Sequence, residues 1–147
     1  MMTTKMKILI VEDEFTSRLL LQTLLAPYGE CHIAANGKEA VSAFRNALET
    51  EQPYDLVCLD IMMPEKDGHE ALQEMRAVEE DRNIASTHRA KLIMTTALRD
   101  VKNVAAAYDE LCDGYLAKPI DKAELMALLL ELKVGSKKLS RNSLVQL

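Results

Sequence analysis

The chain has 147 residues, of which 48% are hydrophobic and 28% charged, and its formal net charge is −5. This size and composition are typical of one soluble globular domain, and the acidic balance excludes a general nucleic-acid or membrane-surface binder. No apolar run approaches the ~18 residues of a transmembrane helix and no secretory signal is recognisable, so we expect a cytoplasmic protein. The three cysteines lack metal-ligand spacing and are expected to be reduced thiols.

Short apolar runs alternate with segments of helical periodicity along the chain. The predicted strands are Lys7–Val11, Glu30–Ala35, Leu56–Leu59, Lys91–Thr95 and Gly114–Ala117. The predicted helices are Phe15–Leu24, Lys38–Thr50, His69–Ala77, Val101–Leu111 and Asp121–Leu132. This alternation predicts an α/β fold, in which a doubly wound five-stranded parallel sheet carries helices on both faces.

The first predicted helix follows an acidic run at the end of the first strand. Thr16 or Ser17 offers its N-cap. Its apolar residues at helical spacing are Phe15, Leu19, Leu20 and Leu24. Such a stripe is typical of an amphipathic helix that packs on a sheet.

Turn-forming and polar residues separate the other elements. Asn36-Gly37 and Asp67-Gly68 are interpreted as turns, and Asp100 as the N-cap of the fourth helix. Residues 79–89 are polar, mixed in charge and without apolar period, which predicts extra turns of exposed helix, a loop, or both. Residues 133–147 form a polar, mildly basic tail that is too short for a second domain.

Polar side chains follow four of the predicted strands at the edge where the carboxyl ends of parallel strands meet. In chain order they are Glu12, Asp13 and Glu14, then Asp60, then Thr95 and Thr96, and finally Lys118. Ligands of open α/β sheets bind at this edge, so the set is a candidate functional site.

The chemistry that needs this set is phosphoryl transfer onto a carboxylate. A carboxylate can act as a nucleophile and carry a phosphoryl group. Neighbouring carboxylates repel one another, and a hard cation such as Mg²⁺ relieves that repulsion while it binds phosphate oxygens. A lysine adds a positive charge for the transferred group, and a threonine hydroxyl can follow the phosphate by hydrogen bonding.

Four motifs occur in order, ILIVEDE, LVCLDIMMPEKDG, TTA and GYLAKPI. With these motifs the chain resembles a response-regulator receiver domain from Lys7 to Leu132. The resemblance implies a flavodoxin-like sheet with strand order 2-1-3-4-5, the order of chemotaxis receivers. It also implies a receiver domain at residues 1–132, followed by the tail at residues 133–147 and no output domain.

The resemblance implies a role for each site residue. Asp60 would be the phospho-acceptor. Asp13 would bind Mg²⁺ directly, Glu12 mostly through water, and the backbone carbonyl of Met62 would be a further ligand.

The remaining roles concern the phosphoryl group and the switch. Lys118 would contact the phosphoryl group, and its bond to Pro119 would be cis. Thr96 would be the switch hydroxyl, although Thr95 beside it leaves the choice between the two hydroxyls open. Tyr115 would be the aromatic residue that turns inward on activation.

Three features depart from the family pattern. Met62 and Leu98 are apolar at positions that tune phosphoryl gain and loss in this family, which predicts a phosphoryl lifetime different from that of chemotaxis receivers. Residues 79–89 are longer than this connection usually is, and are either a solvated extension or a surface for a partner.

The resemblance implies a stand-alone, non-enzymatic signalling module, a monomer or weak dimer. It would accept a phosphoryl group from a histidine kinase or phosphotransfer protein and signal to a protein target, without nucleic acid or membrane. It would act as an effector or as a phosphorelay intermediate.

The sequence offers less support for three other functions. A phosphatase of the haloacid-dehalogenase type needs an acid where Met62 stands. A flavin-binding protein needs a phosphate loop after the first strand. Nucleic-acid contact would rest on the tail residues Lys133, Lys137, Lys138 and Arg141, whose alternative reading is a solvated end.

Overall fold

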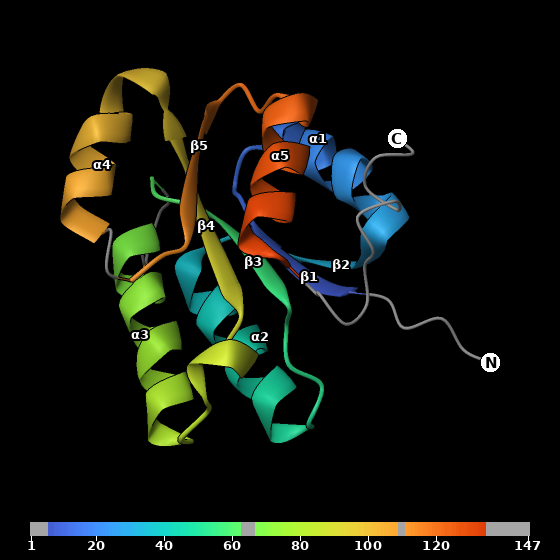
Figure 1. Cartoon of the computed structure of the whole chain (residues 1–147), viewed down its shortest axis with the longest axis vertical. Coiled ribbons are helices and arrows are strands. Elements are labelled where there is room, and N and C mark those ends of the chain that lie inside the picture. Colours follow the sequence, from blue (N-terminus) through green and yellow to red (C-terminus); the bar gives the residue numbers. More distant parts are fainter. Residues whose placement is uncertain (1–5, 63–66, 109–110, 135–147) are drawn as a thin grey trace.

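The computed structural model describes residues 6–62, 67–108 and 111–134 and shows a central sheet between two layers of helices (Figure 1). The five strands are all parallel and are ordered β2-β1-β3-β4-β5. They are β1 (Met6–Val11), β2 (Gly29–Ala34), β3 (Leu56–Asp60), β4 (Lys91–Ala97) and β5 (Gly114–Lys118). This confirms the predicted fold class and strand order.

Five α-helices and three short 3₁₀ segments connect the strands in the described residues. The α-helices are α1 (Phe15–Leu25), α2 (Gly37–Glu49), α3 (Gly68–Asp81), α4 (Val101–Tyr108) and α5 (Lys122–Leu132). The 3₁₀ segments are η1 (Ala26–Tyr28), η2 (Ser86–His88) and η3 (Leu98–Asp100). Because every strand runs the same way, all their carboxyl ends lie at one edge of the sheet.

Alternating side chains of each strand feed two separate apolar layers. The strand residues facing α2, α3 and α4 are Leu9, Val11, Val57, Leu59, Leu92 and Met94. Those facing α1 and α5 are Met6, Ile8, Ile10, Leu56, Cys58 and Ile93. Burial on both faces explains why β3 reads as a continuous apolar run rather than as an alternation.

The two dipeptides interpreted as turns are helix starts. Asn36 and Asp67 are the N-caps of α2 and α3, and each side chain accepts a hydrogen bond from the backbone N–H three residues ahead. The glycine that follows each cap is the first helical residue. Asp121 caps α5 in the same way, which places that helix where the sequence predicted it.

The prediction for α1 is wrong in its cap and in its buried face. Glu14 is the N-cap residue, without a side-chain cap bond, and the Ser17 hydroxyl donates to the Glu14 carboxylate. The sheet side of α1 carries Leu21 and Leu25, and Leu24 of the predicted stripe packs partly buried against the same layer. The other members of that stripe are exposed, Phe15 by 62% and Leu19 by 50%.

Residues 79–89, which were predicted as exposed helix, a loop, or both, begin with a buried charge. α3 continues to Asp81, and Glu79 is 1% exposed. Its carboxylate accepts from Arg76 at 2.8 Å and from the Ala90 backbone N–H at 2.9 Å. The same guanidinium donates to Asp113 at 2.9 Å, so it joins α3 to the starts of β4 and β5. A loop and η2 follow α3, as one of the alternatives predicted.

The fourth helix does not extend to Leu111 as predicted. Its described part, α4, is Val101–Tyr108, and Leu111 lies in a turn while packing against the α2–α4 side of the core. Asp100 belongs to η3, the 3₁₀ turn that leads into α4.

At the other end, α5 finishes as predicted at Leu132, but packing continues to Val134, which is 3% exposed. Residues 135–147 of the predicted tail lie outside the described residues. Among the described helices, none is long and apolar enough to cross a membrane.

Candidate phosphoryl-acceptor site

Three strands bring their terminal polar residues to one point of the sheet edge. Glu12 directly follows β1, Asp60 is the last residue of β3, and Lys118 is the last residue of β5. Strand alternation places all three on the side of the sheet that carries α1 and α5. Asp13, in the loop that enters α1, completes a group that we call the strand-end cluster: Glu12, Asp13, Asp60 and Lys118.

The ammonium group of Lys118 bridges two carboxylates within this cluster. Its Nζ lies 2.6 Å from Glu12 Oε1 and 3.2 Å from Asp60 Oδ2. Glu12 is 0% exposed and Asp60 5%, so both negative charges are largely shielded from water. The other oxygen of Asp60, Oδ1, accepts from the backbone N–H of Met62 at 3.3 Å.

The cluster perturbs the titration of two of its members. Burial raises the pKa of the Glu12 carboxyl, the neighbouring Asp60 carboxyl raises it further, and Lys118 opposes the change. Burial acts to lower the pKa of Lys118, but its contacts with Glu12 and Asp60 outweigh that effect and raise it. The arrangement therefore keeps Lys118 charged next to carboxylates that repel each other.

The three carboxylates fit a hard divalent cation. Ligand oxygens of Glu12, Asp13 and Asp60 all lie within 4.8 Å of one another. Mg²⁺ is bound by one or two carboxylates and keeps several waters, so one ion can contact two of these groups and reach the third through water. The single lysine leaves a net negative charge in the cluster, which a cation neutralises.

Gly68 allows the start of α3 to lie against the end of β3. The Gly68 N–H donates to the Ile61 carbonyl at 3.0 Å. A Cβ at this position would lie 2.5 Å from the Asp60 carbonyl oxygen and 2.7 Å from Ile61 Cα, distances that the backbone cannot accept. Gly68 thus allows α3 to start close to Asp60, a role that the turn interpretation had missed.

The two threonines at the end of β4 are both buried, but they face opposite sides. Thr95 is the register partner of Asp60, and its carbonyl accepts from the Ile61 N–H at 3.3 Å. Thr96 is 4% exposed and alternates to the side of the sheet that carries α4. Thr95 therefore lies on the same sheet face as Asp60, and Thr96 lies on the opposite face, which carries α4.

The predicted switch aromatic contacts α4. Tyr115 is half-buried against the core on the α2–α4 side, and its hydroxyl donates to the Ala105 carbonyl at 3.3 Å. The peptide bond between Lys118 and Pro119 is cis, as the resemblance implied. Met62 and Leu98 are 77% and 73% exposed, so both apolar side chains lie at the protein surface.

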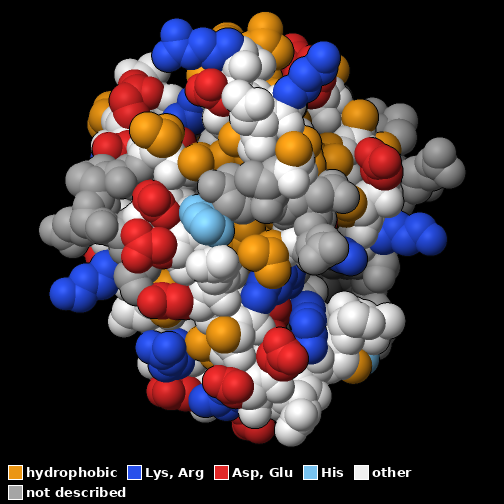
Figure 2. Space-filling model, turned by 90° about the vertical axis from the view of Figure 1, so that its left-hand side faces the viewer, with side chains coloured by type: hydrophobic (Ala, Val, Ile, Leu, Met, Phe, Trp, Pro, Cys, Tyr) orange, Lys and Arg blue, Asp and Glu red, His pale blue; other side chains and the backbone are white. Residues whose placement is uncertain are grey.

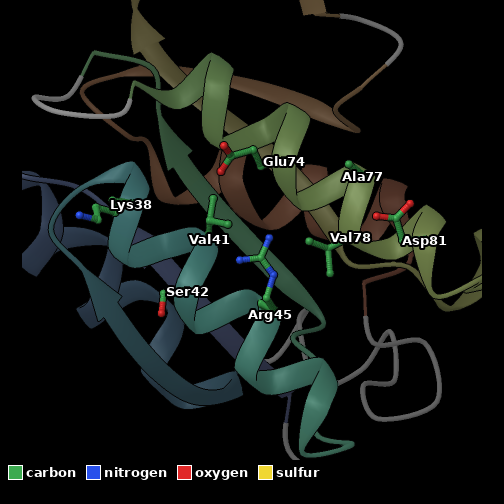
Figure 3. A pocket seen from close by; sticks show the side chains of 8 residues that line it. All are labelled: Lys38, Val41, Ser42, Arg45, Glu74, Ala77, Val78 and Asp81. Atoms are coloured by element: carbon green, nitrogen blue, oxygen red, sulfur yellow. The ribbon is translucent and has the colours of Figure 1, made fainter.

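A polar groove of about 430 Å³ lies between α2 and α3, away from the strand-end cluster (Figure 3). Its α2 wall carries Lys38 and Arg45, its α3 wall carries Glu74 and Asp81, and no predicted site residue lines it. On the face that carries α3 and α4, acidic and basic side chains are interspersed, as on an ordinary solvated surface (Figure 2).

Comparison with known proteins points the same way as the geometry. The family model for the response regulator receiver domain matches residues 8–130. A probable transcriptional regulator, ycf27 of Cyanophora paradoxa, is 40% identical over 124 residues, which are 84% of this chain and 46% of that protein. The chain spans about half the length, or less, of the curated relatives it matches.

Solved structures share the whole fold. The receiver domain of sensor histidine kinase PA1611 from Pseudomonas aeruginosa, with magnesium coordinated in its active-site cleft, is 28% identical with a TM-score of 0.69, covering 87% of this chain and 97% of that one. The co-crystal structure of Ypd1 with the receiver domain of Ssk1 from Saccharomyces cerevisiae matches with 25% identity and a TM-score of 0.71, covering 96% and 97%. The chain belongs to the response regulator receiver domain family of two-component signalling.

Proposed function

We propose that this protein is a phospho-accepting response regulator. A histidine kinase or a histidine phosphotransfer protein donates a phosphoryl group to Asp60, and the phosphorylated form signals to a protein target. The observation that carries the proposal is the environment of Asp60, a buried carboxylate with Lys118 Nζ at 3.2 Å and two further carboxylates beside it.

The transfer is a substitution at phosphorus. An oxygen of the Asp60 carboxylate forms a bond to phosphorus, the bond between phosphorus and the donor imidazole nitrogen breaks, and that nitrogen keeps the electron pair. The product is an acyl phosphate. Lys118 supplies positive charge to the transferred group, and the Met62 N–H holds Oδ1 of the acceptor carboxylate.

Asp13 and Asp60 would hold Mg²⁺ directly, Glu12 through water, and the Met62 carbonyl would be a further ligand. When bound, the cation neutralises the charge of the carboxylates and of the incoming phosphoryl group. Glu12 also fixes Lys118 through the 2.6 Å contact, so the lysine stays next to Asp60.

The signal would leave the site through β4 and β5. Thr96 is the residue after Thr95, the register partner of Asp60, so its hydroxyl would reach the phosphoryl group around the carboxyl end of β4 and not from the sheet face of Asp60. Its own sheet face is that of the residues that contact α4. Tyr115 links β5 to α4 through its bond to Ala105, so a shift of Thr96 and Tyr115 would change the α4–β5–α5 surface.

The receiver unit is residues 1–132 in this proposal, with residues 133–147 as a tail, and the unit is a monomer or weak dimer. It acts as a signalling module rather than as an enzyme on a separate substrate. Two outputs fit this site: binding of a target by the phosphorylated form, and onward transfer of the phosphoryl group to another histidine protein. Onward transfer would discharge the acyl phosphate when an unphosphorylated phosphotransfer protein is added.

Intact mass after incubation with acetyl phosphate and Mg²⁺ tests the proposal. We expect one phosphoryl adduct that requires Mg²⁺ and disappears in Asp60→Asn. Asp55→Asn is the matched control, because Asp55 lies at the opposite end of β3. An adduct that persists in Asp60→Asn would refute the assignment. If no adduct forms, beryllofluoride binding separates a receiver that needs its own kinase from one that signals without phosphate.

A further inference from the structure

One outer edge of the sheet has no strand beside it in the described part of the chain. β2 pairs with β1 along its whole length and with no other described strand. Its six residues, Gly29–Ala34, include neither lysine nor proline, and its register with β1 runs without a bulge. Lysine, proline and bulges are the usual means by which proteins protect an open strand edge. β2 therefore has an edge to which a further strand can be added.

The pairing with β1 shows which backbone groups of β2 point outward. The Glu12 N–H donates to the Ala34 carbonyl at 3.1 Å, so the backbone polar groups of Ala34 point toward β1. Successive residues of a strand direct these groups to opposite sides. Cys31 and Ile33 consequently direct their N–H and C=O groups away from β1, along the open edge.

A carboxylate and an imidazole lie on the same face of this edge strand. His32 Nε2 is 2.9 Å from Glu30 Oε1, and the two side chains are 36% and 69% exposed. The other ring nitrogen of His32, Nδ1, lies 2.8 Å from the hydroxyl of Tyr54, which is 5% exposed. The buried tyrosine thus fixes the ring with its Nε2 side toward Glu30, and both side chains remain accessible to a partner.

We propose that β2 binds β2 of a second copy of this chain in antiparallel orientation, with the twofold axis at Cys31. In this register Glu30 of each copy lies opposite His32 of the other, so a carboxylate meets an imidazole twice. The two Cys31 residues lie opposite each other. Because both direct their backbone groups outward, they form a hydrogen-bonded pair of the antiparallel ladder.

The same register places Ile33 opposite Gly29. A Cβ at position 29 would lie 2.2 Å from the Met6 carbonyl oxygen, so the approach of β1 already requires glycine there. Ile33 is 39% exposed, and opposite a residue without a side chain it has room and gains burial. Registers centred on Glu30 or on His32 place two carboxylates or two imidazoles opposite each other and lose both mixed pairs.

The contact is short, so the dimer is expected to be weak. Two strands of six residues each bury much less surface than a stable interface of standard size. The strand-end cluster takes no part in this contact. The dimer and the proposed function can therefore be refuted separately, and the dimer can be tested without Mg²⁺ or a phosphodonor.

Amide hydrogen exchange of the full chain, followed by NMR at low and high protein concentration, tests the contact. We expect the amides of Cys31 and Ile33 to exchange rapidly in dilute protein and several-fold more slowly in concentrated protein. The amides of Glu30 and His32 face β1 and serve as the internal control, protected at both concentrations. Exchange of Cys31 and Ile33 that does not depend on concentration would overturn the proposal. If these amides are already protected in dilute protein, the edge is covered within a single chain.

Sedimentation equilibrium of matched variants tests the surface. Ile33→Lys places a charge on the edge and should weaken dimerisation about tenfold. Leu19→Lys makes the same change at an exposed apolar residue of α1 and should leave dimerisation unchanged. Equal losses in the two variants would refute the β2 contact.

A charge exchange tests the register. Glu30→Lys should weaken dimerisation because it brings a lysine opposite His32 of the other copy. Combining Glu30→Lys with His32→Glu should restore the dimer, since a carboxylate again faces a cation at both positions. A double variant that associates no better than Glu30→Lys alone would refute the register centred on Cys31.

Discussion

The substitution Asp13→Asn should stabilise the metal-free protein and remove its response to Mg²⁺. Oxygens of Glu12, Asp13 and Asp60 lie within 4.8 Å of one another. At that distance two like charges repel by about 1 kcal/mol in water and by about 3–4 kcal/mol at an effective dielectric constant of 20. Asp13 is exposed and Lys118 offsets part of the field, so we expect a gain of about 1 kcal/mol in the free energy of unfolding.

Urea unfolding with and without Mg²⁺ measures both effects. Mg²⁺ at 100 times its dissociation constant should stabilise the wild type by about 2.7 kcal/mol, because only the folded state assembles the site. Asp13→Asn should lose most of this gain. Asp81→Asn, at the far end of α3, removes the same charge and should leave the Mg²⁺ response unchanged. An Asp13→Asn protein that is less stable without metal, or equally responsive to it, would contradict the electrostatic argument.

Three further predictions use the same unfolding assay. Arg76→Met should cost about 3–5 kcal/mol because it leaves Glu79 buried and unpaired, whereas Arg82→Met, which breaks an exposed pair, should cost less than about 1 kcal/mol. Burial raises the pKa of Glu12 above its ordinary value of 4.5. The contribution of protonated Glu12 to the free energy of unfolding is therefore complete below about pH 4.5 and is lost as the pH rises through the pKa of the folded state. Without metal, wild-type stability should therefore fall toward neutral pH relative to Glu12→Gln, and parallel pH profiles would contradict this. Gly68→Ala should cost about 1–3 kcal/mol and weaken the Mg²⁺ response, because the added Cβ displaces the backbone of Asp60 and Ile61. Full stability would show that this backbone shifts at little cost.

The architecture and the gathering of Glu12, Asp60 and Lys118 were predictable because both follow from topology. Apolar runs mark the strands, parallel strands align their carboxyl ends, and residues at those ends must meet. The distances within the group were not predictable in this way. That Lys118 contacts Glu12 more closely than Asp60 depends on side-chain burial and charge, which a one-dimensional pattern does not contain.

The spacing of apolar residues could not predict which face of α1 is buried. The helix has apolar residues on more than one side, so a helical stripe can be drawn through Phe15 and Leu19 or through Leu21 and Leu25. Only the packing decides that the second stripe faces the sheet. Glu79 was missed for a related reason: a carboxylate in a polar stretch looks solvated unless its distant partners, here Arg76 and the Ala90 N–H, are known.

The strand-end cluster shows how the fold sustains an arrangement that is unfavourable by itself. Two buried carboxylates and a third at the surface gain too little from one lysine to offset their repulsion and loss of hydration. The sheet beneath them is buried on both faces, and its apolar layers supply the stability that the cluster lacks. Any group that brings positive charge to such a cluster stabilises the folded protein, because it offsets the repulsion between the carboxylates. In a metal-binding cluster, the stability of the metal-free protein should therefore rise and the affinity for metal should fall when a carboxylate is removed, whereas in a merely structural cluster only the stability changes. The substitution Asp13→Asn separates these two cases.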